Sequence, residues 1–80
     1  MKGMIHFVDE LIDYSKIDVN SDDDLDFANL MLLEETATND ITTARNFIEI
    51  ILTTDNTNKP VYRQALRETL DRIQRKKEMN

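Results

Sequence analysis

The scarcity of residues that bend the backbone constrains this chain more than any other feature. Its 80 residues include one glycine, Gly3, and one proline, Pro60. Tight turns between strands draw heavily on both residue types, so a β-rich fold is hard to build from such a chain. Apolar side chains recur instead at intervals of three and four positions, which is the period of an amphipathic helix. The sequence therefore predicts an all-α fold, a small bundle of three to four helices.

The apolar spacing divides the chain into four predicted helices. They span residues 3–17, 22–37, 40–53 and 60–77. Ser21 and Asp24 fit a capping box at the start of the second helix. Pro60 suits the first turn of the last helix, where its missing N–H group has no partner to lose.

The boundary between the second and third predicted helices stays open. Apolar positions keep helical spacing from Leu33 through Ala37 to Ile41, and neither glycine nor proline interrupts them. One continuous helix of about 30 residues is therefore an alternative. The weak helix formers Thr38 and Asn39 favour a break, and we predict two separate helices.

The first predicted helix has an apolar face wider than one neighbouring helix covers. A chain of this length forms one domain, here residues 1–80, and buries only about 60–65% of the surface that its unfolded form exposes. A second chain on the surplus face would add buried area. We therefore expect Phe7, Leu11 and Tyr14 to contact a protein partner, most simply a second copy in a homodimer or other homo-oligomer.

Charge is distributed unevenly along the chain, whose net charge is −6. Residues 1–40 hold eleven acids and two lysines, whereas residues 41–80 hold eight bases and five acids. The two halves can pair within one molecule or between copies. The overall acidity opposes attraction to phosphates, so direct nucleic-acid binding is not expected. An alternative is an acidic mimic of nucleic acid, with the carboxylates of residues 9–40 in the DNA-binding site of a target protein.

The residue types needed for catalysis are sparse. The chain has no cysteine, two serines and one histidine, His6. His6 and Ser15 stand nine positions apart, about 13 Å along a helix axis, which is too far for a nucleophile and its base. We therefore predict a protein that is not an enzyme and needs no cofactor.

The start of the chain has an apolar patch, but His6, Asp9 and Glu10 interrupt it early. A secretory signal has a basic start and a longer unbroken apolar stretch. No apolar run approaches the roughly 20 residues that span a bilayer. The sequence thus predicts a cytoplasmic protein without a membrane segment.

Residues 18–29 contain a regular series of oxygen-bearing side chains. Acids or amides stand at the first, third, fifth and ninth places, and the aliphatic Leu25 stands at the eighth. This segment resembles the twelve-residue calcium loop of EF-hand proteins, especially the dockerin variety. It covers a small part of the chain, and no second copy of the loop occurs.

The resemblance implies a Ca²⁺ site made of five residues. The ligands would be side-chain oxygens of Asp18, Asn20, Asp22 and Asp26 and the backbone carbonyl of Asp24. The sequence departs from the family pattern at Asp23, where the family has glycine, and at Asn29, where the family has an acid. The alternative is an acidic loop between two helices.

These features together predict a binding protein. A short chain with surplus apolar helix surface and few reactive groups is typical of proteins that act by stoichiometric association. We therefore expect a small acidic regulator, inhibitor or immunity-type accessory factor that binds a macromolecular partner. The calcium-binding module and the acidic mimic remain the alternatives.

Overall fold

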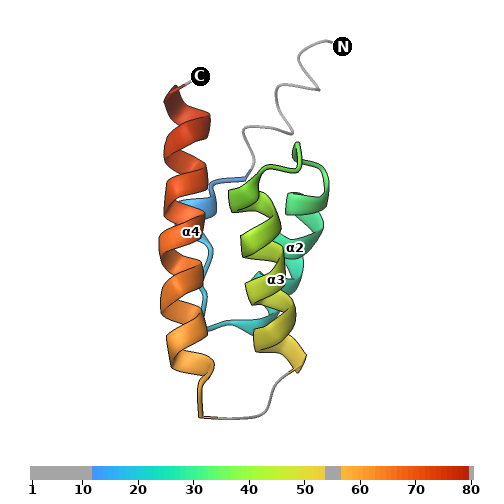
Figure 1. The fold of residues 1–80 in the computed structure, drawn as a ribbon, viewed down its shortest axis with the longest axis vertical. Helices are drawn as coiled ribbons and strands as arrows, with labels where there is room; N and C mark the ends of the chain where they lie inside the picture. The colour runs from blue at the N-terminus through green and yellow to red at the C-terminus, as the bar shows by residue number, and fades with distance from the viewer. Residues whose placement is uncertain (1–11, 54–56, 80) are drawn as a thin grey trace.

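The computed structural model describes residues 12–53 and 57–79 of the chain (Figure 1). Within these ranges every regular element is a helix. The elements are the short 3₁₀ helix η1 (Tyr14–Lys16) and the α-helices α2 (Asp22–Leu33), α3 (Asn39–Thr53) and α4 (Lys59–Met79). The predicted all-α class is confirmed. Among residues 12–53 and 57–79, no helix combines the length and the hydrophobicity that a membrane span requires.

The three α-helices run alternately up and down, with α3 in contact with both α2 and α4 (Figure 1). The segment 12–20 runs along α4 in the opposite direction, and η1 packs against α4. All four elements contribute to one core. Its buried side chains are Ile12, Tyr14, Ile17, Leu25, Ala28, Leu32, Ile41, Ala44, Ile48, Ile51, Leu66, Leu70 and Ile73.

The predicted helix over residues 3–17 is wrong in its described part. Asp13 has an extended backbone, with φ −120° and ψ 105°, and only Tyr14–Lys16 form a helical turn. The Asp13 carboxylate accepts a hydrogen bond from the backbone N–H of Ser15, and such local bonds compete with helix formation. Residues 3–11 of the predicted helix lie outside the described residues.

Contacts with α4 supply a second reason for the extended course of residues 12–17. The Arg67 guanidinium donates hydrogen bonds to the backbone carbonyls of Tyr14 and Ile17. The side-chain oxygen of Gln74 accepts from the backbone N–H of Tyr14. These polar groups are satisfied by α4 rather than by a helix of their own.

The predicted break between the second and third helices is confirmed, but α2 ends earlier than residue 37. Glu34 follows its last residue, and the Glu34 N–H still bonds back to carbonyls of α2. Thr38 then opens α3, since its side-chain oxygen accepts from the N–H of Ile41 at 3.3 Å. Ser21 caps α2, because its hydroxyl accepts from the N–H of Asp24 at 3.3 Å. The other half of the predicted capping box does not form, since the Ser21 N–H donates to the Asp18 carbonyl and the Asp24 carboxylate accepts from the Asp18 N–H. Ser21 and Thr38 therefore act as the N-caps of α2 and α3.

Candidate interaction surface

The acidic and basic halves of the chain pair within one molecule. The pairs are Asp22–Arg63 at 3.2 Å, Glu35–Lys77 at 2.9 Å, Asp40–Arg72 at 3.2 Å and Asp40–Lys76 at 2.8 Å. Three acids of the first half are therefore engaged by α4. The acidic-mimic alternative needs free carboxylates on one surface, and it stays a prediction that these pairs do not favour.

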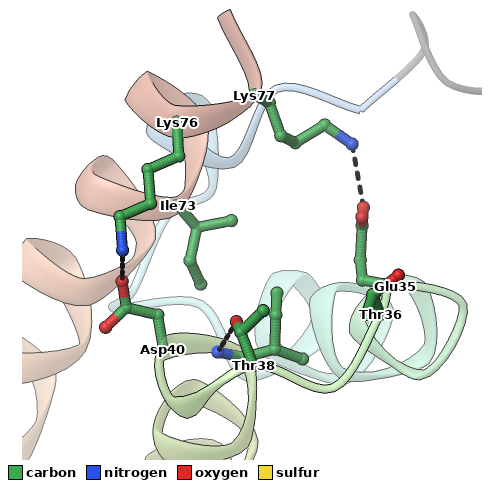
Figure 2. A pocket seen from close by; sticks show the side chains of 8 residues that line it. Glu35, Thr36, Thr38, Asp40, Ile73, Lys76 and Lys77 are labelled. Atoms are coloured by element: carbon green, nitrogen blue, oxygen red, sulfur yellow. Dashed lines mark hydrogen bonds and ion pairs between the residues drawn. The ribbon is translucent and has the colours of Figure 1, made fainter. Parts of the chain in front are cut away.

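A hollow of about 310 Å³ lies between the α2–α3 loop, the start of α3 and the end of α4. Figure 2 shows Lys76 reaching Asp40 and Lys77 reaching Glu35, with Ile73 between the two pairs. Each lysine is matched by a carboxylate, so the charge of the hollow is largely neutralised. These ion pairs hold the α2–α3 loop and the start of α3 against α4. We call the pairs of Asp40 with Arg72 and Lys76, and of Glu35 with Lys77, the clasp.

Asp40 is the most enclosed carboxylate of this clasp, with 16% of its side chain exposed. Hydrogen bonds from Lys76 and from Arg72 hold the pKa of Asp40 below its ordinary value of 3.8. A depressed pKa in the folded state means that the carboxylate stabilises the fold above pH 3.8. This contribution is lost as the pH falls below 3.8 through the folded-state pKa.

We expect Asp40→Asn to lower the free energy of unfolding at pH 7 by about 1 kcal/mol, because two partly exposed ion pairs are lost. The difference from the wild type should shrink as the pH falls below 3.8. Urea unfolding at pH 7 and at successively lower pH measures both effects. Asp23→Asn is the matched control, since Asp23 is an exposed aspartate in the first turn of α2. Equal losses for the two variants at pH 7 would contradict a specific role for the clasp.

Tyr14, one of the three predicted partner contacts, lies in the core instead. Its side chain is completely buried. Its hydroxyl donates to Glu35 at 2.8 Å, and the Lys77 ammonium lies 5.6 Å from the centre of its ring. Burial against α4 therefore removes Tyr14 from the surface of a single chain. Phe7 and Leu11, the other two predicted contacts, lie outside the described residues.

The five predicted calcium ligands are divided between a turn and a helix. Asp18 and Asn20 precede α2, whereas Asp22, Asp24 and Asp26 belong to its first two turns. Several oxygens of these residues already have partners within the chain. The Asp18 carboxylate accepts from the Asn20 N–H, and the Asp24 carboxylate accepts from the Asp18 N–H. The Asp22 carboxylate pairs with Arg63. Within residues 12–53 and 57–79, no group of three or more His, Cys, Asp or Glu side chains is arranged to hold a metal ion.

The calcium alternative remains a prediction that this geometry does not favour, and a thermal melt decides it. A ligand that binds only the folded state raises the melting temperature. We expect the melting temperature in millimolar Ca²⁺ to match that in the same concentration of Mg²⁺. An upward shift seen with Ca²⁺ alone, and lost in Asp18→Asn, would restore the calcium site.

The outward side of α2 carries a group of large apolar side chains in the open. The exposed fractions are 50% for Phe27, 57% for Leu30 and 53% for Leu33. Residues three apart lie on the same side of a helix, so these side chains form one continuous row. We call this row, with the exposed acids Asp23, Asp26 and Glu34, the outer face of α2.

The packing of α2 explains why this face is uncovered. Leu25, Ala28 and Leu32 bury the opposite side of the helix in the core. A shallow hollow of about 250 Å³ adjoins Phe27 and is lined by Ile12, Asp13, Lys16, Ile17, Asp24 and Phe27. The outer face of α2 thus borders a hollow that it shares with residues 12–17.

Phe27, Leu30 and Leu33 were not among the partner contacts predicted from the sequence, although the composition of α2 contains a signal for them. Seven of the twelve residues of α2 are apolar, more than one buried stripe requires. That surplus was the available signal. Comparison with models of protein families, with curated proteins and with solved structures finds no match to this chain.

Proposed function

We propose that this chain is a small acidic helical protein that binds a macromolecular partner, a protein, in fixed stoichiometry. It acts as a regulator, inhibitor or immunity-type accessory factor rather than as an enzyme, and it works in the cytoplasm. The outer face of α2 is the surface that we assign to this binding.

One observation carries the proposal, namely the adjacency of three half-exposed side chains on one helix, Phe27, Leu30 and Leu33. Isolated apolar side chains are common on protein surfaces, whereas contiguous ones mark interaction sites. Complete burial of such a side chain contributes about 1.5–3 kcal/mol, so covering the exposed half of all three supplies about 2–4 kcal/mol. That gain is a substantial share of the binding free energy of a micromolar complex, about 8 kcal/mol.

Affinity capture from the native host tests the proposal. The bait variant carries Phe27→Gln, Leu30→Gln and Leu33→Gln, because glutamine keeps a helix propensity close to that of leucine. The control bait carries Val61→Gln, which changes an apolar side chain of α4 that is 67% exposed. We expect the wild type and the control to retain one protein in a fixed ratio, and the triple variant to lose it. Retention by all three baits would contradict the assignment to α2.

Self-association is the companion proposal, and it concerns Phe7 and Leu11 rather than the outer face of α2. A second copy of the chain can cover apolar side chains such as these. Sedimentation equilibrium of the wild type and of Phe7→Gln measures it. We expect a concentration-dependent dimer whose stability falls when Phe7 is changed. A strict monomer at high concentration would contradict it and leave the binding of another protein unaffected.

A further inference from the structure

We infer that the partner bound by the outer face of α2 is a basic amphipathic helix, with aliphatic side chains in a row and Lys or Arg beside them. This inference rests on the proposed function, because it names the class of partner for the same surface. Three observations support it. They are the charge of the outer face of α2, the shape of that face, and the poor match of a second copy or of residues 1–11 to it.

The charge around the apolar row is acidic. Positions four apart are neighbours on a helix surface, so Asp23 lies beside Phe27, and Asp26 and Glu34 lie beside Leu30. All three acids are exposed. Residues 18–35 contain seven acids and no lysine or arginine, and two of the seven, Asp22 and Glu35, are paired with α4. Asp23, Asp26 and Glu34 are not among the acids paired with α4. Basic side chains in a partner would meet these carboxylates while aliphatic ones covered the row.

The shape of the surface fits a helix. The row from Phe27 to Leu33 extends about 9 Å along α2, which is between one and two helical turns. A partner helix presents its own apolar side chains at three- and four-residue spacing and can lie along such a row. The hollow beside Phe27, with Ile12 and Ile17 in its wall, can receive one further side chain of the partner. It holds two acids, Asp13 and Asp24, and one base, Lys16, so its charge is also negative.

A second copy of the chain fits the outer face of α2 poorly. Pairing α2 with another α2 places like-charged carboxylates opposite one another, which opposes binding. The basic helix α4 lacks an apolar row, because among its described residues the exposed large apolar side chains are Val61 and Met79, at opposite ends. Helix α3 presents one exposed large apolar side chain among its described residues, Ile50, so it also lacks an apolar row. None of the three α-helices of a second copy therefore supplies both a row of apolar side chains and positive charge.

Residues 1–11 of the chain contain apolar side chains but lack the net positive charge that would complement the outer face of α2. This segment contains one lysine and two acids, Asp9 and Glu10. A segment with more acids than bases gains no charge attraction from Asp23 and Asp26. The carboxylates of the outer face therefore favour a separate basic partner over this segment.

Two synthetic peptides of about 18 residues test the inference by isothermal titration of the full-length chain. Both place leucine at amphipathic helical spacing; one has lysine at its polar positions and the other has glutamate. We expect the leucine–lysine peptide to bind at least about tenfold more tightly, since exposed ion pairs contribute modestly but several act together. The preference should shrink at high salt, which screens exposed charges.

Two variants show whether binding uses the outer face of α2. Phe27→Gln with Leu30→Gln and Leu33→Gln should weaken binding of the leucine–lysine peptide about tenfold or more. Asp23→Asn with Asp26→Asn and Glu34→Gln should reduce the preference for lysine over glutamate. Circular dichroism confirms that both variants remain helical. Val61→Gln, on α4, should bind like the wild type.

Several outcomes would overturn the inference. Equal binding of the two peptides, or no binding of either, would show that the partner is not a basic helix, while the capture experiment would still decide the proposed function. Binding that ignores the triple glutamine variant would reflect general attraction between opposite charges. A dimer abolished by Leu30→Gln would assign the face to a second copy. Binding that appears only after Phe7→Gln would assign it to residues 1–11.

Discussion

Replacing Tyr14 by alanine is expected to lower the free energy of unfolding by about 3–5 kcal/mol, the range for removing a buried aromatic side chain. Tyr14 has no exposed surface and holds residues 12–17 against α4. A domain of 80 residues has a total stability of about 4–12 kcal/mol, so this loss is a large share of the total. Urea unfolding followed by far-ultraviolet circular dichroism measures the loss.

Tyr14→Phe separates the ring from its hydroxyl. This variant keeps the buried ring and loses the hydrogen bond to Glu35, so we expect a loss of only about 1 kcal/mol. If Tyr14→Ala were as stable as Tyr14→Phe, the ring would contribute little. The packing of residues 12–17 on α4 would then be refuted.

The second large effect is expected at Leu66, a core residue of α4. Leu66 is completely buried, and Leu66→Ala should lower the free energy of unfolding by about 2–5 kcal/mol. The loss combines reduced apolar burial with a cavity that the surrounding side chains fill only in part. The same urea titration measures it.

Val61→Ala is the matched control for Leu66→Ala, because Val61 lies on the same helix and is 67% exposed. Its effect should stay within about 0.5 kcal/mol, as is usual for surface substitutions. A loss at Leu66 no larger than that at Val61 would contradict the burial of Leu66 in the core. The comparison therefore tests which side of α4 faces the core.

The helices that the sequence predicted best are those whose apolar period and end signals agree. The prediction of 40–53 corresponds to α3 at Asn39–Thr53, and that of 60–77 corresponds to α4 at Lys59–Met79. Their ends depend on nearby residues such as Thr38 and Pro60. Local chemistry of this kind can be read from sequence.

The segment before α2 was predicted less well because distant residues determine it. Its apolar spacing favours a helix, but Arg67 and Gln74 bond its backbone groups from α4. The burial of Tyr14 has the same origin. A pattern within one segment contains no information on such partners, and tertiary contacts override local propensity.

The candidate surface lies between these two cases. The spacing of Phe27, Leu30 and Leu33 is visible in the sequence, and it indicates a row on one side of a helix. Whether a neighbour covers that row depends on where α3 and residues 12–17 pack. Only the arrangement of the helices reveals that the row stays exposed.

The anchoring of residues 12–17 on α4 has a consequence for biosynthesis. Tyr14 is synthesised at least 53 residues before Arg67, Gln74 and Lys77, which bond or contact it. The nascent polypeptide can form α2 and α3 beforehand, but it cannot close its interior until α4 has left the ribosome. The apolar surface of the earlier residues must stay in contact with water, or with a chaperone, during that interval.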